Sequence, residues 1–465
     1  MVIIMTEYEK KAEAIRELEA DLNHADRDRR LAALSELAAL APDRRPDDGG
    51  TAADSPAAGG AAAVDDSCGA VAAGGAPVEY VNNHIHTTYS FSPYSPAKAA
   101  YMAWSAGLTT AGIMDHDSVA GAREFIRAGE LVGIATTVGL EFRCSMANTP
   151  FSGRLFNNPD QKSVAYLTLH GIPHQNLDRV REYTAPYRAA RNVRSRAMGK
   201  KIDALFAPHG VRLDFERDVR PASNFYDGGA ITERHLLFAL ANRLVERFGR
   251  GEDLLGFLSS AFGVEAAGGA QAKLRDPETP FYEYHLLGLL KSRLMKLVYI
   301  DAAEELPPVR EFLRFAGAVG GIAAYPYLGD VSDSVTGDKE DQAFEDAYLD
   351  ELVPWLAGVG FHALTYMPAR NTRAQLDRVI ALCERHALFQ ISGEDINSPF
   401  QSFTCPALAD PTFSHLITST WALIGHEKAA TRDPEDGLFT ARSIARDPGL
   451  KERIDRFAAL GRGPA

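Results

Sequence analysis

The chain has 465 residues, more than a single ordinary core takes, and its 46% hydrophobic and 24% charged residues are typical of a globular protein. With 49 Lys and Arg against 62 Asp and Glu, the formal net charge of −13 argues against broad, non-specific attraction to nucleic acids or membranes. Four scattered cysteines without a CxxC pair, and an opening that has no long apolar run, predict a cytoplasmic protein without a disulfide framework.

The first part of the chain has two compositions. Residues 1–41 are rich in Ala, Leu, Glu and Arg at helical spacing and predict one N-terminal helix, either solvated or partner-binding. Residues 42–77 are dominated by Ala, Gly, Asp and Pro, which bury too little apolar surface to offset the chain entropy. We therefore expect a flexible linker and a helical appendage.

From residue 78 short apolar strands alternate with helical stretches, first over 78–177 and again over 302–410. Strand, helix, strand with short connections predicts parallel strands with crossover helices, and the number of such units favours a barrel over an open sheet. The interruption at 178–301 reads as a helical insertion, which in barrels commonly closes over an active site. Residues 411–465 are amphipathic and predict a helical tail packed on the barrel.

Histidines and carboxylates stand where the predicted strands end. His84 and His86 are one residue apart in the first strand, so their side chains share a face about 6.6 Å apart along the strand. The segments MDHDS, GLEFR and ISGEDINSP close three further strands, and parallel strand ends meet at one rim of a barrel. Imidazole with carboxylate suits zinc, manganese or iron. The residues predicted to converge are His84, His86, His116, Glu141 and Asp395.

The succession HIHTTYSFSPYSP, AGIMDHDSVAG, VGLEF, IAAYPY and SGEDINSP resembles the PHP (polymerase and histidinol phosphatase) superfamily, and within it the stand-alone metal-dependent phosphoesterases that act on nucleotides and RNA ends. The likeness runs from about Val81 to Pro399. It implies a distorted (β/α)7 PHP-type barrel with metal ions at the rim. It further implies that His84, His86, Glu141 and Asp395 form the first metal site, and that His116 and His170 are ligands, with His174 on the same side if that segment is helical.

Three positions depart from the family pattern. Phe91 stands where the family usually has Asp, and Tyr325 and Asn397 stand where it usually has His. In the family's arrangement Phe91 and Asn397 belong with His116 on one ion, so we expect that ion to be missing, while Tyr325 weakens another. The resemblance thus predicts one divalent ion (Zn, Mn or Fe), with two as the alternative.

One ion can polarise a phosphoryl oxygen and generate hydroxide near neutral pH. This favours a metal-dependent phosphoesterase acting on a small nucleotide-like or sugar-phosphate substrate, with a nucleotide or short RNA end as candidates. His116 with Asp115 beside it, or His170, would then be the catalytic residues that serve as general acid or base. The alternative is a degenerate barrel that binds a phosphorylated ligand or a partner without catalysis. Lyase or iron redox chemistry stays open, because the sequence does not identify the metal.

Basic residues in the insertion suggest how a phosphate is held. Arg188 and Arg191 share a helical face, and guanidinium pairs suit phosphate, although a solvated basic face is an equal alternative. The related phosphoesterases cap the nucleotide with a helical insertion containing a stretch like ITERHLLFAL, which makes Arg191 and His235 candidate substrate contacts. His235 alone would more often be a packing or capping residue. Arg370 follows a barrel strand and reaches either a phosphate or a surface acid. We expect no membrane association and no extended nucleic-acid surface.

Overall fold

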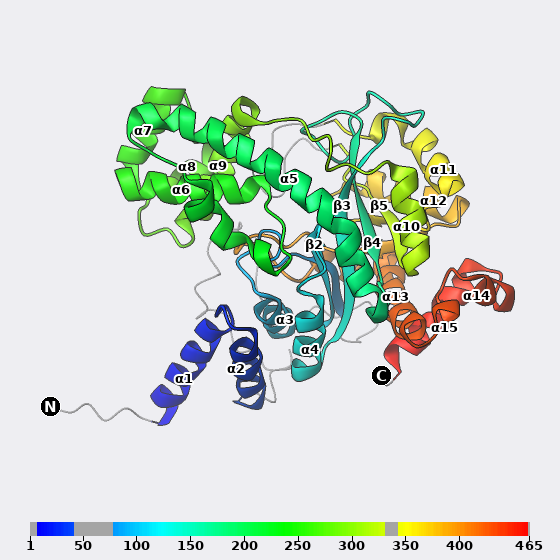
Figure 1. Cartoon of the computed structure of the whole chain (residues 1–465). Coiled ribbons are helices and arrows are strands. Elements are labelled where there is room, and N and C mark those ends of the chain that lie inside the picture. Colours follow the sequence, from blue (N-terminus) through cyan, green and yellow to red (C-terminus); the bar gives the residue numbers. More distant parts are fainter. Residues whose placement is uncertain (1–6, 41–77, 331–342, 464–465) are drawn as a thin grey trace.

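The computed structural model describes residues 7–40, 78–330 and 343–463 (Figure 1). The predicted linker at 42–77 lies outside the described residues. Seven strands form one sheet in sequence order. These strands are β1 (Tyr80–Ile85), β2 (Leu108–His116), β3 (Ala135–Ser145), β4 (Val164–His170), β5 (Ile322–Pro326), β6 (Ala363–Tyr366) and β7 (Phe389–Ser392).

The sheet curves until its two outer strands nearly meet. Ile85 at the end of β1 forms a parallel bridge with Ile396, which follows β7. The amide of His86 donates to the carbonyl of Ile396 at 2.9 Å, and the amide of Ile396 donates to the carbonyl of His84 at 3.0 Å. The prediction of a distorted seven-stranded barrel is confirmed, and the histidines of the first strand lie at its closure.

The prediction that all strands are parallel was wrong for β4. This strand was not identified from the residue pattern, and it runs antiparallel to both β3 and β5. The connection at 146–163 contains no helix, and a parallel neighbour would need a crossover. The remaining neighbours, β1 to β3 and β5 to β7, are parallel, so their carboxyl ends share one rim.

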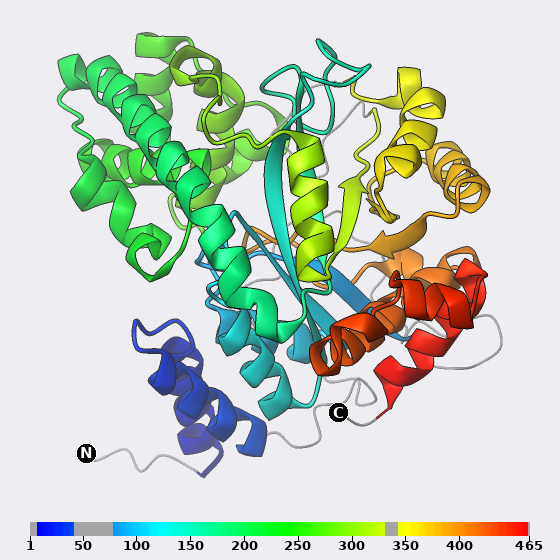
Figure 2. The ribbon, with the colours of Figure 1, turned by 45° about the vertical axis from the view of Figure 1, so that its right-hand side comes forward.

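Helices that connect the strands cover the outside of the barrel (Figures 1 and 2). Phe125, Phe142 and Phe312 are buried in the core between these helices and the sheet. The N-terminus of one helix is fixed by Ser95, whose hydroxyl accepts from the Lys98 amide at 3.0 Å. The outer helices are α3 (Pro96–Ser105), α4 (Ala122–Val132), α10 (Val309–Val319), α11 (Leu349–Val359) and α12 (Arg373–Arg385).

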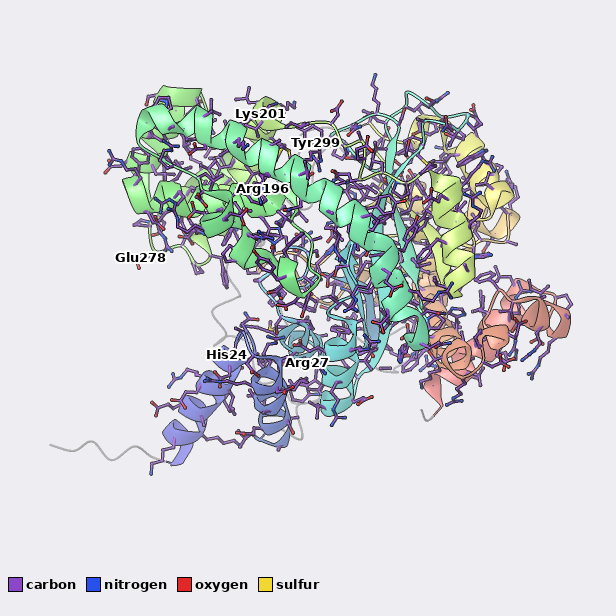
Figure 3. The ribbon with its side chains drawn as sticks, in the orientation of Figure 1. His24, Arg27, Arg196, Lys201, Glu278 and Tyr299 are labelled. Carbon is purple, nitrogen blue, oxygen red and sulfur yellow. The ribbon has the colours of Figure 1, made fainter. Side chains whose placement is uncertain are left out.

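The insertion forms a helical cap that stands to one side of the sheet, and its long first helix runs from the barrel into the cap (Figure 1). The cap has its own hydrophobic core, with Ile202, Leu240 and Leu290 buried together. Lys201 and Tyr299 lie near each other in Figure 3, and the Lys201 ammonium donates to the Tyr299 carbonyl at 3.3 Å. The cap helices are α5 (Leu177–Phe206), α6 (Glu233–Phe248), α7 (Glu252–Phe262), α8 (Gly268–Arg275) and α9 (Tyr282–Val298).

The N-terminal segment is two packed helices, α1 (Glu7–Asp21) and α2 (Arg27–Leu40), rather than one helical appendage. His24 lies in the turn between them and Arg27 is the first residue of α2 (Figure 3). The Asp26 carboxylate accepts from the Arg29 amide at 2.9 Å at the start of this helix. Arg30 is buried and pairs with Glu124 of α4 at 2.5 Å. Sequence periodicity missed this packing because the partner carboxylate is 94 residues away.

The C-terminal tail packs against the barrel through α13 (Ser414–Arg432), followed by α14 (Ala441–Arg446) and α15 (Leu450–Arg462). Glu427 of α13 accepts from the Thr137 hydroxyl and the Val138 amide of β3, both at 2.8 Å. Both residues lie near the start of β3, so α13 covers the end of the barrel opposite the rim. Within the described ranges no helix is long and apolar enough to cross a membrane.

Candidate metal centre

Two histidines and a glutamate come together where the carboxyl ends of β1, β2 and β3 meet. His84 Nε2 lies 3.7 Å from Glu141 Oε1, and His86 Nε2 lies 3.9 Å from Glu141 Oε2. The ligand atoms of these three residues all lie within 4.8 Å of one another. His116 pairs with Glu141 across the β2–β3 register, and its Nδ1 lies 2.8 Å from Glu141 Oε2. We call His84, His86 and Glu141 the HHE cluster.

The nitrogen donors of this site are buried, and the described residues near them are carboxylates of the same site. His84 Nε2, His86 Nε2 and His116 Nδ1 have no hydrogen bond of good geometry among the described residues, although His116 and His86 lie within ion-pair distance of Glu141 and Asp395. A buried polar atom without a partner costs free energy, and natural proteins retain few of them. Two imidazoles and a carboxylate are a donor set of the kind that zinc, manganese and iron take. The residues present therefore fit a divalent transition-metal ion.

Asp395 borders the cluster from the segment after β7. Its Oδ1 lies 3.2 Å from His86 Nε2, and the same oxygen accepts from the Asn397 side-chain amide at 2.8 Å. The Asp395 side chain is 41% exposed, whereas those of His86 and Glu141 are 1% and 11% exposed. Asp395 thus stands on the solvent side of the cluster.

The pKa shifts of the site point in two directions. Burial raises the pKa of Glu141, and the contacts of His86 with Asp395 and Glu141 outweigh its burial and raise its pKa. Burial lowers the pKa of His84 and lowers that of His116 well below its ordinary value, so both imidazoles are neutral near pH 7. The surrounding protein opposes ionisation of Asp395, but its contact with His86 and the nearby His84 outweigh this and lower its pKa. Neutral imidazole and ionised carboxylate are the forms that bind metals.

Asp115 was predicted as a catalytic residue, but the structure turns it away from the cluster. Its carboxylate accepts from the Thr87 amide at 2.7 Å, the Thr87 hydroxyl at 2.6 Å and the Ser90 hydroxyl at 2.6 Å. Ser90 Oγ in turn lies 3.1 Å from His86 Nδ1. Asp115 therefore orients a candidate ligand through Ser90. The alternation of strand faces, which groups His84 with His86, also separates Asp115 from His116.

His170 and His174 lie at different places. His170 ends β4, is 2% exposed and places Nε2 3.0 Å from Thr168 Oγ1. Since Thr168 pairs with Glu141, His170 faces the barrel interior below the cluster, where burial and the nearby His84 lower its pKa to about 3. The expectation that His174 shares this side was wrong.

His174 is turned toward the opposite end of the barrel. Its Nε2 lies 2.8 Å from Oε1 of Glu427 in α13. The segment containing His174 is a short 3-10 helix. Residues four apart share a face in an α-helix but not in this segment, so His174 does not face the same side as His170. His174 therefore binds the tail rather than a substrate at the rim.

Arg191 was predicted to contact substrate, but its charge is already neutralised. Its guanidinium is 2% exposed and lies 2.5 Å from Asp117 Oδ2 and 2.8 Å from Glu233 Oε2. These groups belong to a buried ion-pair network that joins the barrel to the cap. Its members are Arg143, Arg191, Arg194, Asp117, Glu233 and Glu305.

The other predicted contacts divide. His235 forms a capping box with Thr232 at the start of α6 and is 2% exposed, which is the packing and capping role weighed from the sequence. Arg370 donates from Nε to the Leu328 carbonyl at 3.1 Å. Arg188 is half-buried beside the residue that follows His116, because its Nη1 donates to the Asp117 carbonyl at 3.4 Å.

The three departures from the family pattern all lie outside the HHE cluster. Phe91 packs into the cap core, with its ring 5.0 Å from that of His235. Tyr325 is fully buried beside Glu345 and Tyr348, where burial raises its pKa well above the ordinary value. The side-chain amide of Asn397 donates a hydrogen bond to Asp395.

Several residues of the site were missed from the sequence. Thr87 and Ser90 follow the His84–His86 pair in the motif HTTYS and support it. Tyr166 places its ring 5.5 Å from that of His116. Glu233 and Glu305 bind the arginines from 39 and 111 residues away, so no local pattern marks them.

A nearly closed seven-stranded barrel with a two-histidine, one-carboxylate cluster at its rim defines the class: a barrel protein with a candidate metal site. No family model matches the sequence, and no curated protein matches it. Solved structures that share parts of the fold include a phosphoesterase-like protein and an amidohydrolase.

One is a protein of Bifidobacterium adolescentis provisionally assigned as a metal-dependent phosphoesterase, with a TM-score of 0.47 and 17% identity over 73% of this chain and 95% of that one. The other is an amidohydrolase of Chromobacterium violaceum with bound sulfate and no metal, with a TM-score of 0.47 and 16% identity over 73% and 96%. At these values neither neighbour defines what the chain does.

Proposed function

We propose that the chain is a metal-dependent phosphoesterase that hydrolyses a phosphoester of a small nucleotide-like or sugar-phosphate substrate. The observation that carries the proposal is the convergence of three buried imidazole nitrogens on the carboxylate of Glu141. His84, His86 and Glu141 would hold the ion, and Asp395 would complete the set from the solvent side.

The chemistry that a bound divalent ion supplies is polarisation of a phosphoryl oxygen and a lowered pKa of water. The chain's own residues do the rest. Asp115 and Ser90 hold His86 in one orientation. A neutral His116 can accept a proton at the ring nitrogen that does not face Glu141. His170 is buried below the cluster and is the second candidate for moving a proton.

The second candidate function is binding of a phosphorylated ligand without turnover. One observation favours it. Phe91, Tyr325 and Asn397 are packed or hydrogen-bonded outside the HHE cluster, so the remaining donors suffice for only one ion. A mononuclear hydrolase remains the main proposal, because the surviving donors are complete and one side of the cluster is open at Asp395.

The first test is metal content by mass spectrometry on protein purified without chelators. We expect about one equivalent per chain from the one cluster, lost in His84→Ala. His209→Ala removes an exposed cap imidazole and serves as the matched control, which should keep its metal. Absence of metal from the parent chain, or its retention in His84→Ala, contradicts the assigned site.

The second test is hydrolysis of p-nitrophenyl phosphate and AMP with zinc, manganese or iron. The phosphoesterase proposal expects turnover that disappears together with the metal in His84→Ala. If the parent chain binds metal and AMP raises its Tm more than that of His84→Ala, yet no phosphoester is hydrolysed with any of the three ions, the binding function replaces it.

A further inference from the structure

A hollow of about 510 Å³ lies between the first half of α5 and the segment that precedes α6. It adjoins the loop after His116, because the Ser118 hydroxyl donates to the Gly228 carbonyl at 2.7 Å. None of its lining residues belongs to the HHE cluster. We call it the α5 hollow, and it is lined by Arg181, Glu182, Ala185, Arg188, Phe225, Tyr226, Asp227 and Gly228.

Arg188 is the residue in the α5 hollow whose charge is least compensated. Its Nη1 donates to two uncharged oxygens, the Asp117 carbonyl at 3.4 Å and the Thr184 hydroxyl at 3.2 Å. No carboxylate of a described residue lies within ion-pair distance of its guanidinium, whereas Arg191 one turn away has two. A half-buried guanidinium without a counter-ion favours an anion in the space it faces. Arg181, 3.8 Å from Asp178 on the surface, adds a second positive group.

Tyr226 gives the α5 hollow an exposed aromatic wall. Its side chain is 79% exposed, which is high for so large a ring. The Arg220 guanidinium lies 4.1 Å from the ring centroid, and Arg220 also pairs with Glu216 at 2.5 Å. The cation on one side orients the ring and leaves area for stacking against a planar ligand.

The lining also contains two carboxylates, Glu182 and Asp227, so the charges of the α5 hollow balance. A ligand that is only an anion would be attracted by the arginines and repelled by these acids. A ligand that also offers N–H donors satisfies both, because carboxylates accept hydrogen bonds strongly.

We propose that the α5 hollow binds a nucleotide-type ligand: a planar ring with N–H donors stacked on Tyr226, carrying a phosphate held by Arg188 and Arg181. The ring and phosphate could also belong to a simple aryl phosphate, which lacks the N–H donors. This inference does not depend on the proposed hydrolysis, because no residue of the α5 hollow lies in the HHE cluster.

The test is isothermal titration of the full chain carrying His84→Ala, so that the cluster makes no contribution, and of the unaltered chain. AMP should bind in both backgrounds. Arg188→Met should weaken AMP about tenfold or more and leave adenosine unchanged, since a hydrogen bond to a charged group is lost. Tyr226→Ala should weaken AMP and adenosine and leave ribose 5-phosphate unchanged. Arg179→Met, on an exposed arginine of the same helix, should change none of them.

Titration with phenyl phosphate distinguishes a nucleotide ligand from a simple aryl phosphate. It should bind about tenfold more weakly than AMP, because it offers nothing to Glu182 and Asp227. Equal affinity for the two overturns the N–H part of the proposal. AMP affinity that is the same in Arg188→Met, Tyr226→Ala and their parent overturns the site itself. Tyr226 is exposed, so Tyr226→Ala keeps the test decisive if Arg188→Met does not fold.

Discussion

The guanidinium of Arg191 lies 2.5 Å from the carboxylate of Asp117, the residue that follows His116. Arg191 belongs to α5 of the cap and Asp117 to the rim of the barrel, so this contact joins the two parts beside the HHE cluster. Asp117 also has a φ of 54°, a left-handed conformation that an Asp or Asn tolerates better than most residues. The contact fixes the backbone next to His116.

We expect Arg191→Met to lower the free energy of unfolding by roughly 3–5 kcal/mol, because it leaves buried Asp117 and Glu233 without their cation. Urea unfolding of the full chain measures this. The control is Arg123→Met, which removes an exposed ion pair with Asp178 and should change stability little.

The double variant Arg191→Met with Asp117→Asn removes the unpaired charge and keeps a residue suited to a positive φ. We therefore expect it to be more stable than Arg191→Met alone. Strictly additive losses from the two substitutions would mean that Arg191 and Asp117 are not energetically coupled.

Asp115 should tune the candidate metal site without touching it. Asp115→Asn disturbs the bonds to Thr87 and Ser90 that orient His86, so we expect metal affinity to fall by about 10–100-fold with the ligands intact. Competition with a chelator measures the affinity. Asp178→Asn is the surface control, and an unchanged affinity in Asp115→Asn would show that His86 needs no support from this carboxylate.

Much of the candidate site could be predicted from the sequence, because strand geometry is local. The two-residue repeat places His84 and His86 on one face, and parallel strand ends bring His116 and Glu141 to the same rim. The roles of these residues stay predictions until metal binding is measured.

What the sequence could not supply are the long-range pairings. The strand at Val164–His170 was missed because it returns beside β3 without a helix, against the alternation of its neighbours. Arg191 was predicted as one of a phosphate-binding pair along α5, and its acids, Asp117 and Glu233, have no local signal. Fold therefore follows from periodicity, whereas charge compensation depends on contacts that only the folded chain defines.

Phe91 limits any attempt to restore the family's usual ligand. Its ring packs in the cap core against His235, Phe238 and Tyr284, at centroid distances of 5.0, 5.7 and 5.8 Å. We expect Phe91→Asp to cost roughly 3–5 kcal/mol of stability, because it removes a buried ring and buries a carboxylate. Phe91→Leu should cost less in the same urea titration. An additional metal equivalent in Phe91→Asp, with stability unchanged, would show instead that the loop can reach the cluster.

Acid should destabilise the protein through His426. Its imidazole is 3% exposed, its Nδ1 accepts from the Leu438 amide at 2.9 Å, and burial lowers its pKa from 6.5 to about 4. Because the folded pKa lies below the unfolded value, the stabilisation is complete above pH 6.5 and is lost as the pH falls through 4. The loss approaches about 3 kcal/mol.

Unfolding free energies between pH 7 and 4 measure this effect. We expect the slope to be smaller in His426→Gln than in the parent chain, and unchanged in the surface control His209→Ala. A parent slope that survives in His426→Gln would assign the acid sensitivity to other buried histidines, such as His235, whose pKa burial lowers to about 3.

Alkaline pH should destabilise the protein through Glu345. This side chain is fully buried, and its Oε1 accepts from the Leu328 amide at 2.9 Å. Oε2 has no hydrogen-bond partner among the described residues. Burial raises its pKa from 4.5 to about 8. Because the folded pKa lies above the unfolded value, the stabilisation is complete below pH 4.5 and is lost as the pH rises through 8.

Glu345→Gln keeps the shape and the bond to Leu328 but cannot ionise. We therefore compare the unfolding free energy of Glu345→Gln with that of the parent chain at two pH values. The variant should gain on the parent by roughly 3–5 kcal/mol between pH 5 and pH 9. Glu130→Gln, on the surface of α4, should show no such change. With His426 setting the acid limb and Glu345 the alkaline limb, the stability maximum falls between them. An alkaline limb that persists unchanged in Glu345→Gln would mean that the carboxyl of Glu345 is ionised in the folded protein and finds compensation there.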